Sequence, residues 1–158
     1  MSGTGAPGVE RVDATGLSVA IVAASWHDRI MTALVTSATD YCESAGARVE
    51  ILRVPGTFEL PVVSMSCAQA GFDAVIALGV VIRGGTPHFE YVCDAATSGL
   101  TRVALDTGVP VGFGVLTCDT EAQAIDRSGL PGSREDKGTE AAHAALATAI
   151  VLRDRPTP

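Results

Sequence analysis

Residues 73–92 read DAVIALGVVIRGGTPHFEYV. The first ten of these residues are rich in valine and isoleucine, and a short apolar run of this kind predicts a strand that is buried on both faces of a parallel sheet. Gly84 and Gly85 interrupt the run, and Pro87 suits the first turn of a helix. Apolar side chains then recur at helical spacing over residues 88–106. The stretch therefore predicts a strand, a glycine-rich bend and a helix.

The rest of the chain alternates strands and helices in the same way. Further strands are predicted over residues 17–24, 48–54 and 109–116, and further helices over residues 28–47, 58–70, 120–128 and 134–153. Helices of crossover length between strands imply parallel pairing with both faces of the sheet covered. We expect an α/β fold, a three-layer α/β/α sandwich whose four-stranded parallel sheet has the flavodoxin-like strand order 2-1-3-4.

Length and composition fit one domain. The chain has 158 residues, 47% of them hydrophobic, which is enough to fill a single core. Residues 1–16 are rich in Gly, Thr, Ala and Pro and are predicted to form a flexible N-terminal arm, whereas residues 17–158 form the domain.

Charge and cysteine spacing limit the partners. The net charge of -7 argues against nucleic acid or an anionic membrane as a partner. The four cysteines form no CxxC pair, so neither a metal site nor a disulfide framework is expected. The start of the chain lacks the basic and apolar regions of a signal peptide, and no apolar run reaches membrane-spanning length. We expect a cytoplasmic protein with reduced thiols.

Ligands of such sheets bind beyond the carboxyl ends of the strands, so residues at these ends are candidate site residues. Trp26 follows the first strand; it is either a packing residue or a flat surface on which a planar heterocycle stacks. Gly56 follows the second strand and allows a tight turn before a helix. Glu59 lies in the first turn of that helix, either as a surface carboxylate or as an acceptor for a polyhydroxylated ligand.

The third strand ends at the bend of the opening stretch. Gly84, Gly85 and Thr86 offer backbone N–H groups before a helix N-terminus, an arrangement that suits an anion. His88 follows at once, and a histidine beside an anion site suits proton transfer near neutral pH.

Two cations follow the fourth strand. Arg127 and Lys137, the only lysine, are either surface charges or groups that steer an anionic substrate. Phe113 lies inside the fourth strand, where a core position would be the ordinary interpretation. His27 and His143 are interpreted as structural.

Several motifs together resemble the 6,7-dimethyl-8-ribityllumazine synthase family of riboflavin biosynthesis. They are SWH at 25–27, PGTFELP at 55–61, ALGVVIRGGTPHFEYV at 77–92, GVLT at 114–117, EAQAIDR at 121–127 and EDKG at 135–138. The resemblance runs in order from about residue 14 to residue 153. It implies a transferase that condenses 5-amino-6-(D-ribitylamino)uracil with 3,4-dihydroxy-2-butanone 4-phosphate, the penultimate step of the pathway, without metal or cofactor.

The resemblance also implies a role for each candidate residue. Trp26 would stack on the pyrimidine, and His88 and Arg127 would be catalytic. The remaining substrate-binding positions would be Gly56, Thr57, Phe58, Glu59, Val80, Val81, Ile82, Gly84, Gly85, Thr86, Phe113 and Lys137. Of these residues, Phe113, Arg127 and Lys137 match family residues that reach in from a neighbouring subunit.

The chain departs from the family pattern at two of these positions. Thr57 stands where many members have alanine, and Gly85 stands where many have a side chain. Neither change removes a proposed catalytic group.

The family resemblance further implies homo-oligomers with active sites at subunit interfaces, and riboflavin synthase as a partner. The turn GLPGSREDKG at 129–138 is longer than the turn usual in shell-forming members, so we expect a free pentamer. Three alternatives remain: a flavin- or nucleotide-binding module without chemistry, a Schiff-base aldolase using Lys137, and a shell protein with a vestigial site.

Overall fold

The computed structural model describes residues 8–156 and contains one four-stranded sheet. Its strands are β1 (Ser18–Ala24), β2 (Arg48–Val54), β3 (Ala74–Ile82) and β4 (Val111–Cys118). All neighbouring strands are parallel, in the order β2-β1-β3-β4. The predicted fold class and strand order are confirmed.

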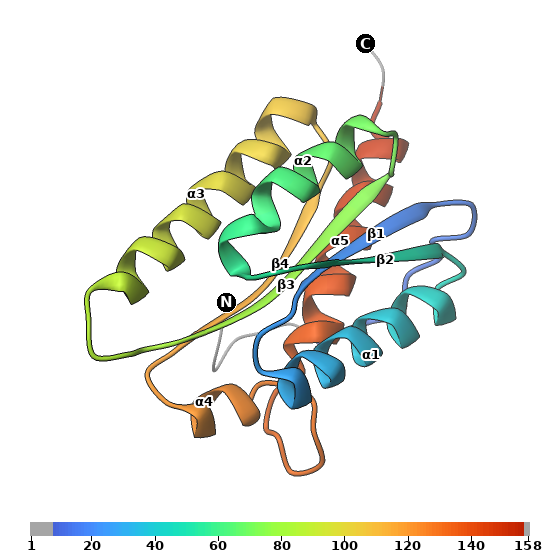
Figure 1. Ribbon diagram of the computed structural model, residues 1–158. Coiled ribbons are helices and arrows are strands. Elements are labelled where there is room, and N and C mark those ends of the chain that lie inside the picture. The colour runs from blue at the N-terminus through green and yellow to red at the C-terminus, as the bar shows by residue number, and fades with distance from the viewer. Residues whose placement is uncertain (1–7, 157–158) are drawn as a thin grey trace.

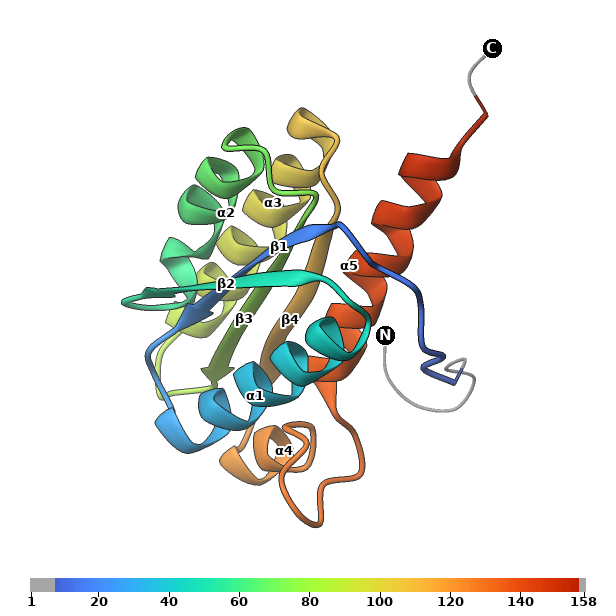
Figure 2. The ribbon, with the colours of Figure 1, turned by 90° about the vertical axis from the view of Figure 1, so that its right-hand side faces the viewer.

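Helices cover both faces of the sheet. They are α1 (Asp28–Ser44), the short 3-10 helix η1 (Thr57–Glu59), α2 (Leu60–Gln69), α3 (His88–Thr107), α4 (Glu121–Ile125) and α5 (Lys137–Asp154). The pair α2 and α3 packs on one face, and the pair α1 and α5 packs on the other (Figures 1 and 2). Helix α4 lies beside the start of α1, at the edge of the sheet where the strands end.

Each face of the sheet has its own core. Alternate residues of β3 point to opposite sides, so Ile76 and Leu78 pack with α1 and α5, whereas Val75 and Ala77 pack with α2 and α3. All seven residues of β1 are buried, as expected for a central parallel strand. β2 is an edge strand, and Val54 at its end is its only buried residue.

Several element boundaries differ from the prediction. The helix expected over residues 58–70 begins as η1, with Pro61 in the first turn of α2. Helix α5 begins at Lys137 rather than at residue 134, because the side chain of Asp136 caps it by accepting from the amide of Thr139 at 3.0 Å.

Helix α5 approaches its neighbours closely because small residues line its inner side. Ala141, Ala142 and Ala145 are buried there. A Cβ atom built at Gly112 of β4 would overlap the main chain of α5, and one built at Gly138 would overlap the main chain of α1 at Leu34. This close approach fixes where the segment between β4 and α5 lies.

Residues 8–16 form no helix or strand, but they are tied to the end of α1. The hydroxyl of Tyr41 donates to the carbonyl of Glu10 at 2.8 Å, and the amide of Ala14 donates to Ala45. The division into an arm and a domain stays a prediction, and residues 1–7 lie outside the described part.

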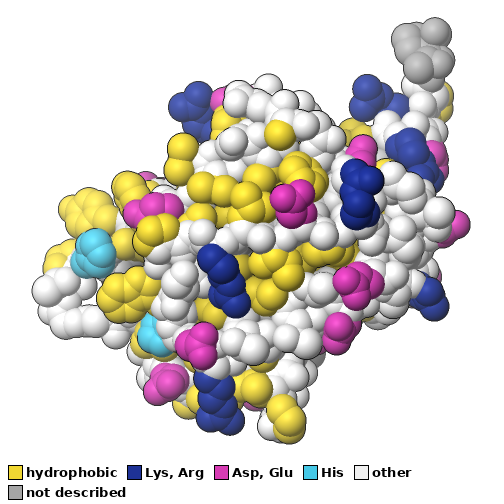
Figure 3. Space-filling model, turned by 45° about the vertical axis from the view of Figure 1, so that its right-hand side comes forward, with side chains coloured by type: hydrophobic (Ala, Val, Ile, Leu, Met, Phe, Trp, Pro, Cys, Tyr) yellow, Lys and Arg dark blue, Asp and Glu magenta, His cyan; other side chains and the backbone are white. Residues whose placement is uncertain are grey.

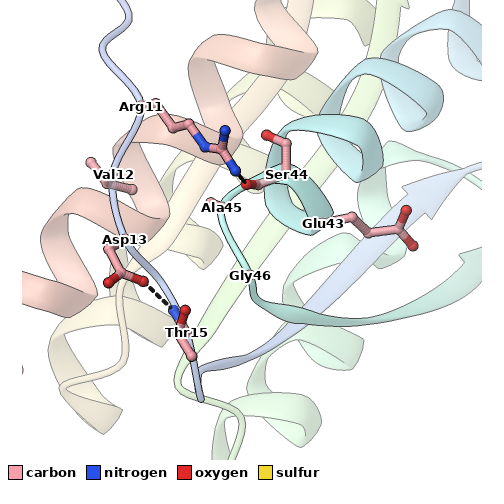
Figure 4. A pocket seen from close by; sticks show the side chains of 8 residues that line it. All are labelled: Arg11, Val12, Asp13, Thr15, Glu43, Ser44, Ala45 and Gly46. Carbon is pink, nitrogen blue, oxygen red and sulfur yellow. Dashed lines mark hydrogen bonds between the residues drawn. The ribbon is translucent and has the colours of Figure 1, made fainter.

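A shallow hollow of about 470 Å³ lies where this segment meets α1 (Figure 4). Arg11 crosses it and donates to the carbonyl of Ser44, and Asp13 accepts from the amide of Thr15 at 3.0 Å. Arg11 and Asp13 are thus already bonded to the main chain, and the hollow is open, so we assign no ligand to it.

The four cysteines are free thiols, and Cys42, Cys67 and Cys118 are buried. Burial raises the pKa of Cys42 to about 12, with a smaller contribution from the nearby charge of Glu43. Burial raises the pKa of the other three thiols as well. They are therefore neutral and unreactive at physiological pH.

We expect Gly138→Ala to lower the free energy of unfolding by about 2 kcal/mol or more, because the new methyl group has no space beside Leu34 and Ser37. Urea unfolding measures this change. Gly85→Ala is the matched control, since a Cβ there meets nothing within 4 Å; it should change stability by about 0.5 kcal/mol at most. Equal effects of the two substitutions would contradict the close packing of α5.

We expect stability to fall as pH rises from about 9 to 12. The unfolded thiol of Cys42 releases its proton near 9, whereas the folded thiol holds it to about 12, so alkaline pH favours the unfolded chain. Urea unfolding at several pH values measures the slope. Cys42→Ala should make the slope shallower, and an unchanged slope would refute the assignment.

Candidate active site

A hollow of about 440 Å³ opens at the carboxyl ends of β1, β2 and β3, beside the start of α3. Its lining residues are Trp26, His27, Gly56, Thr57, Phe58, Glu59, Val80, Val81, Ile82, His88 and Val92. The hollow lies where parallel α/β sheets bind ligands, and its volume suits a small heterocycle. We call it the ring pocket.

Large apolar side chains are exposed around the ring pocket. Trp26 is 67% exposed and Phe58 is 61% exposed, so neither is a core residue. On the face in Figure 3, hydrophobic side chains gather beside histidines, with acidic and basic groups around them. Exposed aromatic surface of this kind is typical of a binding site or an interface, so the packing interpretation of Trp26 is wrong.

The polar groups of the ring pocket lie near its floor. Thr57 is only 6% exposed, and its hydroxyl forms no hydrogen bond within residues 8–156. Gly79 makes room for it, because a Cβ there would come within 2.7 Å of that hydroxyl. The carboxylate of Glu59 lies beside Gly56, whose missing side chain leaves this corner open toward Trp26.

His27 also lines the ring pocket, which sequence reasoning missed. It has φ 59° and ψ 57°, a left-handed conformation that is uncommon for a residue with a side chain. Its carbonyl accepts from the amides of Ile30 and Met31 at 2.9 Å and so starts α1. Its position directly after Trp26 at a strand end was the available signal. His143 is structural as predicted, bonded to Tyr41 at 2.7 Å.

The bend of residues 84–87 lies between Ile82 and His88, which both line the ring pocket, although Gly84, Gly85 and Thr86 do not line it themselves. Within residues 8–156, the amides of these three residues donate no hydrogen bond. Neither glycine has a positive φ, and a Cβ on either would enter open space. The glycines therefore leave the amides uncovered rather than enabling a tight turn.

The bend leads into the N-terminus of α3. No side chain caps this helix, so within residues 8–156 the amides of His88 and Phe89 have no acceptor, whereas the amide of Glu90 donates to the carbonyl of Pro87 at 3.1 Å. His88 is exposed at this terminus, within reach of a ligand in the ring pocket. Free amides at a helix N-terminus provide the setting in which proteins bind phosphate.

A second hollow, of about 350 Å³, lies along the free edge of β4. Its lining residues are Phe113, Gly114, Val115, Leu116, Thr117, Cys118, Gln123, Arg127 and Lys137. Phe113 is 46% exposed, so it is not a core residue. We call this hollow the edge pocket; it has no lining residue in common with the ring pocket.

The two cations of the edge pocket differ in their partners. Lys137 lies between Glu135 at 2.5 Å and Glu140 at 2.6 Å. Burial alone would lower the pKa of Lys137, but its hydrogen bonds to these carboxylates outweigh burial and raise it. Arg127 is half-buried, donates to the carbonyl of Gln123 at 2.9 Å and pairs with no carboxylate among the described residues. Arg127 is therefore the better placed of the two to bind an anion.

The residues of one chain thus form two groups. Trp26, Thr57 and His88 come together at the ring pocket, whereas Phe113 and Arg127 line the edge pocket. Within residues 8–156, no cluster of three or more His, Cys, Asp or Glu side chains is arranged to hold a metal. Among those residues there is also no helix of the length and apolarity needed to cross a membrane.

The fold and these pockets define a flavodoxin-like α/β protein with a pocket at the carboxyl ends of its parallel strands. The sequence profile of the 6,7-dimethyl-8-ribityllumazine synthase family matches residues 16–153. This chain belongs to that family, whose members are enzymes of riboflavin biosynthesis.

Individual relatives agree over nearly the whole length. The chain is 68% identical to the 6,7-dimethyl-8-ribityllumazine synthase of Leifsonia xyli subsp. xyli, over 97% of this chain and 98% of the relative. It is 62% identical to that of Kineococcus radiotolerans, over 97% and 95%. It is 57% identical to that of Streptomyces avermitilis, over 100% and 99%.

Proposed function

We propose that this enzyme condenses 5-amino-6-(D-ribitylamino)uracil with 3,4-dihydroxy-2-butanone 4-phosphate. The products are 6,7-dimethyl-8-ribityllumazine, phosphate and water, in the penultimate step of riboflavin biosynthesis. The observation that carries the proposal is the pairing of a pocket walled by an exposed tryptophan with amides that have no acceptor among residues 8–156. A second pocket of the same chain holds Arg127, which forms no salt bridge among these residues. Family membership supports the same reaction.

The ring pocket suits the pyrimidine substrate. Trp26 offers a flat face for stacking, and Val80, Val81 and Ile82 give the opposite apolar wall. Glu59 accepts hydrogen bonds from the ribityl hydroxyls. The hydroxyl of Thr57, which has no hydrogen-bond partner within residues 8–156, can bond a polar atom at the edge of the ring.

The bend suits the phosphate of the second substrate. Among the residues that the structure describes, the amides of Gly84, Gly85 and Thr86 find no acceptor, and they closely precede His88 in the chain. A guanidinium completes such a site because it binds phosphate through two donors at once. In this chain Arg127 lines the other pocket, so we assign that role to Arg127 of the partner subunit.

The chemistry follows from placing the two substrates side by side. The 5-amino group attacks the butanone carbonyl, and an imine forms with loss of one water. Elimination of phosphate then leaves an enol that tautomerises to a ketone, and the ribityl-bearing nitrogen attacks this ketone and closes the ring with loss of a second water. His88 moves protons during these steps. Holding both reactants in place contributes most to lowering the activation free energy, on the order of 7 kcal/mol. None of these steps draws on a metal or a redox cofactor.

Two separate pockets support a shared active site in a homo-oligomer. Phe113, Arg127 and Lys137 would face the ring pocket of an adjoining chain across the free edge of β4. We propose a free pentamer, because the turn at residues 129–138 is long. We also propose that the enzyme works in the cytoplasm. Riboflavin synthase is the further partner that family membership suggests. The rim of exposed aromatic side chains fits such contacts.

The proposed function is tested by incubating the purified chain with both substrates and detecting 6,7-dimethyl-8-ribityllumazine by chromatography. Product formed at a rate well above that without protein supports the enzyme. Binding of a flavin without product would favour the binding module. Failure of borohydride to trap a substrate on Lys137 would exclude the aldolase, as its two carboxylate partners lead us to expect.

We expect His88→Ala to reduce kcat by roughly 100-fold while leaving measurable turnover, because placement of the substrates survives the loss of proton transfer. Steady-state kinetics and circular dichroism check this outcome. Complete loss of activity in a folded variant would contradict the ranking of placement over proton transfer.

We expect Trp26→Ala and Arg127→Ala to be deficient separately and to complement each other in mixed oligomers. Each chain then supplies the pocket that its neighbour lacks, and about one quarter of the sites in a random mixture regain both intact pockets. The measurement is activity after the two variants are unfolded and refolded together, compared with each refolded alone. Activity equal to the mean of the separate variants would refute a shared site.

A further inference from the structure

The bend at residues 84–87, which carries the uncovered amides, is not stabilised by hydrogen bonds of its own. Residues 84–86 form no backbone hydrogen bond among themselves or with the rest of the described chain. A loop of two glycines held only at its ends would sample many conformations. What fixes its two ends therefore decides where its amides point.

Arg83 joins those two ends. Its amide donates to the carbonyl of Cys118 at 2.9 Å, which extends the pairing of β3 with β4 by one residue. Its side chain then crosses to the far end of the bend, where it donates to the carboxylate of Glu90 in the first turn of α3. The guanidinium carbon lies 4.1 Å from the centre of the ring of Phe89.

The same guanidinium also reaches the segment after β4. Its Nε donates to Asp119 at 2.7 Å. The amide of Asp119 donates to the side chain of Gln123 at 2.8 Å, and the carbonyl of Gln123 accepts from Arg127 at 2.9 Å. One series of contacts thus runs from the bend to the arginine of the edge pocket.

We propose that Arg83 is a positioning residue for phosphate binding: it fixes the bend through Glu90 and Phe89, and through Asp119 it fixes the segment after β4 that leads to Arg127. This inference rests on the proposed function. Arginine suits the task because one planar guanidinium bonds two carboxylates and stacks on a ring together, which a lysine ammonium does not do.

These contacts contribute little to overall stability. The side chains of Arg83, Glu90 and Asp119 are 43%, 56% and 63% exposed, and ion pairs so exposed are weakened by water and salt. The hydrogen bond from Arg83 lowers the pKa of Glu90, so Glu90 stays ionised and the contact persists at neutral pH. A functional effect of removing Arg83 is therefore separable from unfolding.

The test compares Arg83→Ala and Arg83→Lys with Arg102→Ala. Arg102 is a matched control on α3, since it forms one exposed ion pair, with Asp106 at 3.1 Å, and within residues 8–156 it forms no hydrogen bond or ion pair with the bend. We expect Arg83→Ala to raise the KM for the butanone phosphate roughly 10-fold and to leave the KM for the ribitylaminouracil within about two-fold. Arg83→Lys should give an intermediate KM for the phosphate substrate, and Arg102→Ala should match the wild type.

Calorimetric binding of inorganic phosphate separates this proposal from the proposed function. If the wild type makes no product but binds phosphate more tightly than Arg83→Ala, the reaction is wrong and the role of Arg83 stands. The proposal is overturned if Arg83→Ala raises both KM values equally, if it behaves as Arg102→Ala does, or if the wild type binds no phosphate.

Discussion

Parallel pairing of β1 with β3 is the constraint on which the rest of the structure depends. A parallel pair requires a crossover, and each crossover here returns the chain to the same starting edge through a helix. All four strands consequently end at one edge. Trp26, Thr57 and His88 are far apart in the sequence and meet at the ring pocket only because each follows a strand end.

The second pocket depends on a different constraint, the close approach of α5 to the sheet. Glycines and alanines at that contact bring Lys137 against the edge of β4, and the capped start of α5 sets the turn that precedes it. Hydrogen bonds from Arg134 and Glu135 to the carbonyl of Asp126 close this turn at 3.0 and 3.1 Å. Arg127 is thereby held at the rim of the molecule, separate from the ring pocket formed by the same chain.

The sequence sufficed for the features that depend on local pattern. The alternation of strands and helices, the strand-end position of Trp26 and the helix start after Pro87 follow from apolar periodicity and from glycine and proline positions. Pairing between distant side chains could not be predicted from the sequence. Arg83 and Asp119 are 36 residues apart, and no local pattern around either residue indicates their contact. The left-handed conformation of His27 was missed for a different, local reason, since histidine has only a weak preference for that conformation.

Trp26 is the only tryptophan in the chain, and two thirds of its surface is exposed on the wall of the ring pocket. The fluorescence of an indole changes in intensity or wavelength when a flat ring stacks against it. The natural protein therefore carries one intrinsic optical reporter, located at its candidate site. Occupancy of that pocket can be followed by tryptophan emission in the unlabelled chain, with no second indole to dilute the signal.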